Sequence, residues 1–168
     1  MSISEDGLRK NQANFASLSP LSFLERTRKT FPNQTAIEYK DYKLSYKQAG
    51  QRCDALANLI KNQKFNSGST IAVMLPNIPV MWECHFGVPM AIGVLNAINT
   101  RLDSHTVQFI LEHGEAKLFI YDSEYSPIVE KALENLKNPP TVIEFVDEVA
   151  GNKRSNFANK VNCLDYET

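Results

Sequence analysis

Three cysteines and three histidines are the residues of this 168-residue chain best suited to nucleophilic or metal chemistry. Cys84 and His85 are adjacent in an apolar stretch with a helical pattern. Adjacent helical residues do not face each other, so we do not expect this pair to act as nucleophile and base. We expect a partly buried, hydrogen-bonded His85 instead. No metal-ligand spacing is present among the others, which are Cys53, Cys163, His105 and His113. The sequence therefore predicts neither a catalytic residue nor a metal site in this chain.

Two other segments could contribute to a binding site. Pro76-Asn77-Ile78-Pro79 follows an apolar, strand-like run, at the position where open α/β sheets bind ligands. Its prolines lack amide donors for a phosphate, so the segment is either a wall of a substrate or nucleotide cleft or a rigid structural turn. Arg101 could bind a carboxylate or phosphate, or could fix its loop by pairing with Asp103 or a backbone carbonyl. For both segments we favour the structural interpretation.

Composition narrows the class of protein. Neither a Gly-x-Gly-x-x-Gly nor a Gly-Lys-Ser/Thr motif occurs, and the seven glycines are dispersed. A net charge of −1 provides no basic surface for nucleic acid or anionic membrane. Glu5 and Asp6 stand where a signal peptide would be basic, and the longest apolar run, 86–97, is well short of the ~20 residues of a membrane span. Three separated cysteines are typical of a reducing compartment. We expect a cytoplasmic protein with no transmembrane segment and no nucleic-acid partner.

The first third of the chain predicts a helix, a hairpin and a second helix. Ser19-Pro20 is a typical helix start, and Pro32 ends that helix. Two β-prone runs, 35–39 and 43–46, are typical of a hairpin. Ser45 and Gln48 have the spacing of a capping box. The helix that follows has one apolar face, formed by Tyr46, Ala49, Cys53, Leu56, Ala57 and Ile60.

From residue 70 onward, short apolar strands alternate with helices. The predicted strands are 70–75, 94–97, 117–121 and 141–146. The intervening helices begin at Pro79, at Asp103 or Ser104, and at Ser126, and Pro89 should kink or end the first of them. This order predicts an α/β fold with a mostly parallel, doubly wound sheet after the helix–hairpin–helix element.

Within this pattern, particular side chains have expected places. Trp82 and Phe86 are four residues apart on one helix face, so we expect them in the core. His105 and His113 should lie on the surface of a helix. His113 should lie near the C-terminus of this helix, where interaction with the helix dipole stabilises the fold. We expect the strand over 141–146 to be the last, and the polar residues 151–168 to form a loop or to be disordered.

Several segments, in order, resemble one enzyme family. They are residues 14–26, Leu44-Ser45-Tyr46, Leu75–Asp103 with its His85-Phe86-Gly87-Val88-Pro89-Met90 stretch, and the Asn99-Thr100-Arg101-Leu102-Asp103 exit. Together they resemble the N-terminal part of the AMP-forming acyl-CoA synthetases, within the adenylate-forming ligase superfamily. The branch is the one that handles medium-chain and related acyl acids, and the resemblance runs from about Ala13 to Tyr166.

The resemblance implies an enzyme that activates a carboxylic (fatty) acid with ATP and Mg²⁺ to an acyl-adenylate and then transfers the acyl group to coenzyme A. The family's nucleotide loop would lie shortly beyond Thr168, so none of its principal catalytic positions has a counterpart here. We therefore expect an irregular segment over 1–18, the N-terminal portion of the AMP-binding domain over 19–150, and a polar tail over 151–168 leading to the remainder. Cofactor-binding residues stay unassigned, and His85 could line the acyl pocket instead.

The leading hypothesis is an inactive N-terminal fragment whose partner is the remainder of the ligase, on the same chain or a second one. A sheet separated from a larger sheet exposes an edge and apolar faces, so we expect the isolated chain to be marginally stable or partner-dependent. The alternative is a non-catalytic module that binds an acyl or coenzyme A group or pairs with a ligase. A flavodoxin-type domain is disfavoured because the chain does not begin with β–α units.

Overall fold

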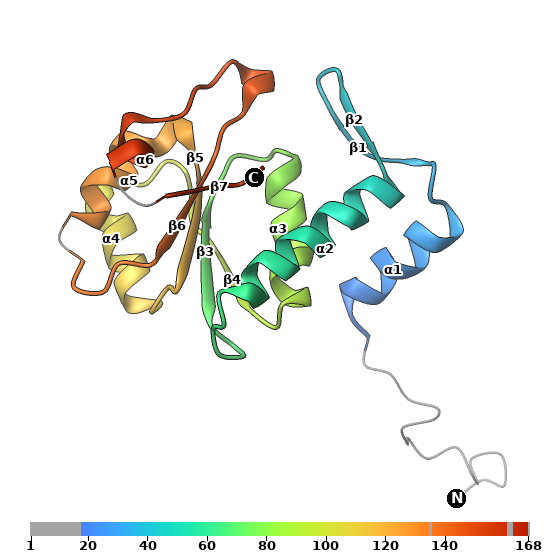
Figure 1. The fold of residues 1–168 in the computed structure, drawn as a ribbon, viewed down its shortest axis with the longest axis horizontal. Helices are drawn as coiled ribbons and strands as arrows, with labels where there is room; N and C mark the ends of the chain where they lie inside the picture. The colour runs from blue at the N-terminus through green and yellow to red at the C-terminus, as the bar shows by residue number, and fades with distance from the viewer. Residues whose placement is uncertain (1–17, 135, 161–162, 168) are drawn as a thin grey trace, which may run out of the picture.

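The computed structural model describes residues 18–134, 136–160 and 163–167, and the irregular segment expected at the N-terminus lies almost wholly outside them. These residues form a five-stranded sheet with helices on both faces, and a separate two-stranded hairpin (Figure 1). Helices α2 and α3 lie on one face of the large sheet, and α4, α5 and α6 lie on the other. The predicted α/β class is confirmed.

Local capping signals set the N-terminal elements. Helix α1 (Pro20–Thr30) begins after Ser19, whose hydroxyl accepts a hydrogen bond from the amide of Leu21. Strands β1 (Thr35–Tyr39) and β2 (Tyr42–Ser45) form the predicted hairpin, with Lys40 in the left-handed region at φ 52°. The predicted capping box is present, because Ser45 and Gln48 bond reciprocally at the start of α2 (Tyr46–Asn62).

The second part of the chain alternates strands and helices as predicted. In chain order the elements are β3 (Thr70–Met74), α3 (Pro79–Met90), β4 (Val94–Ala97), α4 (Ser104–His113), β5 (Leu118–Asp122), α5 (Ser126–Leu133), β6 (Thr141–Phe145), α6 (Asn156–Lys160) and β7 (Leu164–Asp165). The strand order is β4-β3-β5-β6-β7 and every pairing in this sheet is parallel. Helix α3 ends one residue after Pro89, as expected for proline.

Alternation along the strands divides the core into two layers. Ile71 and Val73 of β3 face α2 and α3, whereas Ala72 and Met74 face α4 and α5. Strand β5 lies at the centre and is buried along its whole length. Both faces of the sheet are therefore largely apolar. The buried Glu144 of β6 is an exception, and its Oε1 accepts a hydrogen bond from the Tyr121 hydroxyl at 3.0 Å.

The prediction for the C-terminal tail was wrong in one respect. Strand β6 is not the last, because β7 pairs with it in the register Ile143↔Leu164, and α6 precedes β7. Arg154 supports this short strand: its Nη1 donates to Asp165 Oδ2 at 2.7 Å and its Nη2 to the carbonyl of Cys163 at 3.0 Å. The strand thus depends on contacts outside its own sequence, which periodicity does not reveal.

Candidate functional site

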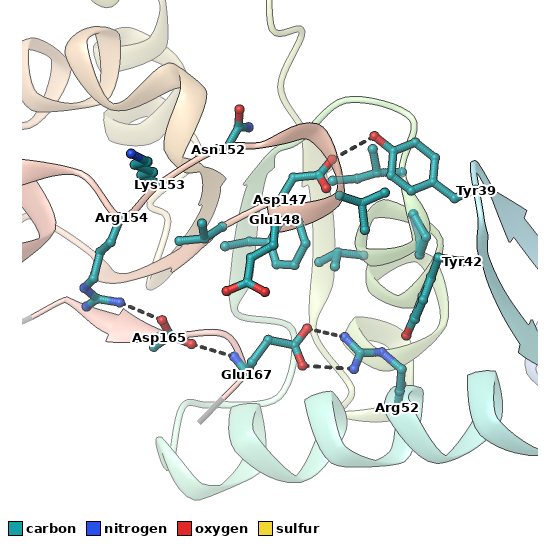
Figure 2. A pocket seen from close by; sticks show the side chains of 16 residues that line it. Tyr39, Tyr42, Arg52, Asp147, Glu148, Asn152, Lys153, Arg154, Asp165 and Glu167 are labelled. Carbon is teal, nitrogen blue, oxygen red and sulfur yellow. Dashed lines mark hydrogen bonds and ion pairs between the residues drawn. The ribbon is translucent and has the colours of Figure 1, made fainter.

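An open cavity of about 670 Å³ lies at the carboxyl edge of the sheet (Figure 2). This edge is where open parallel sheets bind ligands. The walls come from the hairpin, α2, the start of α3, the segment after β6, and the residues around β7. The lining residues are Tyr39, Tyr42, Arg52, Ile78, Pro79, Val80, Phe145, Val146, Asp147, Glu148, Val149, Asn152, Lys153, Arg154, Asp165 and Glu167. Elements that are far apart in the sequence therefore share one site.

The hairpin is joined to the opposite wall of the cavity at its tip. The Tyr39 hydroxyl donates to Asp147 Oδ2 at 2.7 Å, and Lys40 Nζ donates to the carbonyl of Val149 at 3.1 Å. The hydrogen bond to Asp147 raises the pKa of Tyr39 to about 12. Asp147 also accepts from the amide of Ala150 at 3.0 Å, which fixes the turn that carries it. The phenol is therefore a stable donor, not a base, at neutral pH.

A second polar group, the Glu83 cluster, consists of Arg52, Glu83, Tyr166 and Glu167. Arg52 Nε donates to Glu83 Oε1 at 2.5 Å, and the Tyr166 hydroxyl donates to Glu83 Oε2 at 2.8 Å. Arg52 also donates to both carboxylate oxygens of Glu167, at 3.0 and 2.6 Å (Figure 2). Glu167 and Glu83 together raise the pKa of Arg52 above its usual value. Arg52 is therefore a permanent cation held between two carboxylates.

Asp122, at the end of β5, is buried beside the cavity wall. Its Oδ1 accepts from Asn152 Nδ2 at 3.0 Å and from the amide of Glu124 at 2.9 Å. Its Oδ2 and the hydroxyl of Ser123 are buried without a hydrogen-bond partner among the described residues. Burial raises the pKa of Asp122 because desolvation disfavours the charged carboxylate. Only one of the two carboxyl oxygens of Asp122 therefore accepts hydrogen bonds from the described residues.

The buried thiols of α2 and α3 do not provide a nucleophile. Burial raises the pKa of the Cys53 thiol to about 12 and that of Cys84 further, so neither supplies a thiolate nucleophile at neutral pH. Within residues 18–134, 136–160 and 163–167, no group of three or more His, Cys, Asp or Glu side chains could hold a metal ion. The cavity offers an apolar wall and fixed hydroxyl, carboxylate and guanidinium groups.

The Pro76–Pro79 segment lies where the sequence suggested. Ile78 and Pro79 line the cavity, and the amide of Ile78 donates to the carbonyl of Pro76 at 2.9 Å, which makes a tight turn. The segment is thus both a rigid turn and a wall of the cavity.

Arg101 is exposed and lies outside the cavity lining. Its backbone amide donates to Asn99 Oδ1 at 2.9 Å, and the described residues give its guanidinium no hydrogen bond or ion pair. Neither of the two partners considered for fixing its loop, Asp103 or a backbone carbonyl, contacts the guanidinium among the described residues, and Asp103 instead caps α4 by accepting from Thr106.

The histidines also lie outside the cavity. His85 is exposed, so the expectation of a partly buried ring was wrong, although its Nδ1 lies 2.8 Å from the carbonyl of Met81. His105 and His113 are exposed on α4 as expected. Trp82 and Phe86 are only half-buried, and their rings pack on each other with centroids 4.5 Å apart. The buried positions of α3 include Glu83, the one charged residue of the helix apart from the exposed His85.

Five residues that organise the site were not predicted from the sequence. They are Tyr39, Arg52, Glu83, Asp147 and Tyr166. One signal was present: Glu83 is the single acidic residue in the apolar stretch of α3. A charge at a buried helical position requires a partner, so Glu83 could have been identified as a paired group. Its partners could not, because they lie 31 and 83 residues away.

The fold is that of an α/β domain with a cavity at the carboxyl edge of a parallel sheet, and a family model assigns it more closely. The chain matches the family described as AMP-binding enzyme over residues 24–164, and it belongs to that family. No helix within the described part of the chain is long and apolar enough to cross a membrane.

Several relatives are named as CoA ligases. The chain is 36% identical to an acetate–CoA ligase of Humulus lupulus over 96% of its own length and 30% of the relative's. It is 43% identical to a peroxisomal trans-cinnamate:CoA ligase of Petunia hybrida over 78% of its length and 23% of the relative's. It is 38% identical to a peroxisomal butyrate–CoA ligase of Arabidopsis thaliana over 96% and 28%, respectively. The chain thus spans less than a third of the length of these relatives.

Solved structures share the fold. An anthranilate CoA ligase in complex with anthranoyl-AMP superposes with a TM-score of 0.79 at 18% identity, covering 94% of this chain and 29% of that one. An inhibitor-bound N-terminal domain of a Mycobacterium tuberculosis protein, FACL13, superposes with a TM-score of 0.64 at 24% identity, covering 71% and 30%.

Proposed function

We propose that this chain is the N-terminal lobe of an AMP-forming acyl-CoA ligase. The observation that carries the proposal is the family match over residues 24–164 together with relatives that are named as CoA ligases. The complete enzyme would activate a carboxylic acid with ATP to an acyl-adenylate and transfer the acyl group to coenzyme A. Residues 19–150 would form the first portion of the adenylation domain, with 151–168 leading to the remainder.

The described residues do not fit a site for Mg²⁺, and the two arginines of the cavity are not free to bind a phosphate. The described residues contain no cluster of carboxylates that could hold the cation. The arginines of the cavity are already paired, Arg52 with Glu167 and Arg154 with Asp165. We therefore assign the nucleotide, the metal ion and the catalytic groups to the remainder of the ligase, and we propose that this chain alone is inactive.

The substrate and the compartment belong to the same proposal. Relatives named for acetate and butyrate support an aliphatic, fatty acid substrate, and the one named for trans-cinnamate makes an aromatic acid the competing result. The three separated cysteines favour the cytoplasm, whereas several relatives are named peroxisomal. Localising a tagged complete protein and comparing the two acid classes as substrates would decide both points.

Acid-dependent exchange between ATP and pyrophosphate tests the function. We expect no exchange from the 168-residue chain alone, and exchange once it is combined with the remaining part of a CoA ligase. A chain carrying Ile71→Asp, which places a charge in the core, controls for folding. Exchange by the chain alone would show that it carries its own catalytic site. Failure of a folded chain to restore exchange would contradict the assignment as a ligase lobe.

A second candidate is a non-catalytic module that binds an acyl or coenzyme A group. The apolar wall of the cavity, formed in part by Ile78, Val80 and Phe145, favours this alternative. Calorimetric titration of the chain with an acyl-CoA would reveal it as saturable binding with defined stoichiometry.

A further inference from the structure

The buried carboxylate of Glu83 uses both of its oxygens, and it uses them for different parts of the chain. Oε1 accepts from Arg52 on α2, and Oε2 accepts from Tyr166, which follows β7. Glu83 is 0% exposed. Burying a charge is unfavourable unless it is fully paired and hydrogen-bonded. Both carboxylate oxygens of Glu83 accept hydrogen bonds only when Tyr166 is in place.

Arg52 holds both residues that follow β7. Its two terminal nitrogens form a bidentate pair with the Glu167 carboxylate, the geometry that a guanidinium fork favours. Its guanidinium carbon lies 5.9 Å from the centre of the Tyr166 ring, within the range of a cation–π contact. A single side chain on α2 therefore contacts the phenyl ring of one residue and the carboxylate of the next.

The sheet alone gives this segment little support. Strand β7 comprises only Leu164–Asp165. Beyond it, the amide of Tyr166 donates to the carbonyl of Glu144 at 3.1 Å, and the Tyr166 ring meets Phe145 edge-on at 5.8 Å. Two strand residues form too few hydrogen bonds to fix the direction of the chain.

We propose that Glu83 and Arg52 form a receptor for the Tyr166-Glu167 dipeptide, and that this receptor sets the path of the chain as it leaves β7. The dipeptide lies beside the cavity, where Glu167 contributes to the lining. In the proposed acyl-CoA ligase, the chain beyond this point would lead to the nucleotide loop. On that proposed function, Arg52, Glu83 and Tyr166 are positioning residues for the loop, although the receptor itself does not depend on it.

Amide hydrogen exchange in the 168-residue chain, measured residue by residue with NMR, tests the receptor. The reporter is the amide of Tyr166, and the reference amides lie in β3 and β5. For Tyr166→Phe we expect exchange at the reporter to accelerate roughly ten- to a hundred-fold, the range for losing one hydrogen bond to a charged group. Glu167→Gln keeps the shape of the side chain but removes its charge, so we expect a smaller, several-fold acceleration at the same amide.

The matched control is Tyr39→Phe, which removes a tyrosine–carboxylate hydrogen bond elsewhere at the same cavity. It should leave the Tyr166 amide unchanged. Arg52→Lys keeps the charge but not the fork, and should fall between wild type and Tyr166→Phe. Because the measurement requires no turnover, failure of the folded chain to restore ATP–pyrophosphate exchange would refute the proposed function without affecting this result. An unchanged Tyr166 amide in Tyr166→Phe, or equal acceleration in β3 and β5, would overturn the receptor.

Discussion

The hydroxyl of Tyr39 lies 2.7 Å from Asp147 Oδ2, although 108 residues separate the two in sequence. Tyr39 ends the first strand of the hairpin, and Asp147 follows β6. The hairpin forms its own two-stranded sheet and has no strand pairing with the large one. The contact therefore joins two independent sheets across the cavity, and it determines how far the hairpin wall lies from the other walls.

Tyr39→Phe should loosen this wall. We expect a loss of about 1 kcal/mol in the free energy of unfolding, because the hydrogen bond to the Asp147 carboxylate is removed while the ring remains. Urea unfolding measures the loss. Tyr42→Phe is the matched control, since Tyr42 is 38% exposed and its hydroxyl has no hydrogen bond among the described residues. Equal losses in both variants would show that the Tyr39–Asp147 contact contributes nothing specific.

Asp122→Asn should stabilise the chain at neutral pH. Burial raises the pKa of Asp122 above its ordinary value of 3.8, so the folded state is favoured when the carboxyl is protonated. That contribution is complete below pH 3.8 and is lost as the pH rises through the raised pKa. The amide variant is neutral throughout and retains an oxygen that can accept from Asn152.

Unfolding free energies at a series of pH values between 4 and 8 test this expectation. The advantage of Asp122→Asn should grow with pH and then level off above the raised pKa. Asp41→Asn, at an exposed turn residue, should track wild type. A variant that is less stable than wild type at pH 7 by the same amount as at pH 4 would contradict the assignment of a buried, partly unsatisfied charge.

Gly87→Ala should lower the stability of the chain by disturbing the packing of α3 against α2. A Cβ at position 87 would lie 2.8 Å from Leu56 Cδ2 and 3.0 Å from Leu56 Cβ. Such overpacking typically costs about 1–3 kcal/mol. Gly50→Ala on α2 is the comparison, because its nearest neighbour is the flexible side chain of Arg28. Thermal unfolding should rank Gly87→Ala below Gly50→Ala, and the reverse order would show that Leu56 moves freely.

Ile92→Gly should raise stability. Ile92 has a φ of 60°, a left-handed conformation that is strained for a β-branched residue, and its side chain is 64% exposed. Relief of the strain, less the greater entropy of glycine in the unfolded chain, predicts a gain of up to about 1 kcal/mol. Ile92→Ala keeps a Cβ and should gain less. A lower urea midpoint for Ile92→Gly would mean that the side chain packs usefully despite its exposure.

Much of the fold was predictable because its signals are local. Ser45 and Gln48 lie three residues apart and identify the start of α2, and Asp103 does the same for α4. The β-branched run at β3 likewise identifies a strand buried on both faces. By contrast, Leu164–Asp165 becomes a strand only through β6 and Arg154, so the sequence of β7 holds too little information to predict it.

The site was less predictable because its contacts are distant. The Pro76–Pro79 turn could be placed at the sheet edge from its position after a strand. Tyr39 and Asp147 could not, since neither belongs to a motif and each acquires its role from the other. Arg101 illustrates the same limit: a structural role was favoured for its side chain, yet the guanidinium has no hydrogen bond or ion pair among the described residues, and it lies outside the cavity lining.

The separation of 83 positions between Glu83 and Tyr166 also sets a delay during synthesis of the chain. At about 5–20 residues per second, the ribosome adds Tyr166 roughly 4–17 s after Glu83. During that interval the Glu83 carboxylate lacks one of its two hydrogen-bond partners, which makes its burial between α2 and α3 less favourable. We expect the full set of hydrogen bonds around Glu83 to form only after residue 166 has been made.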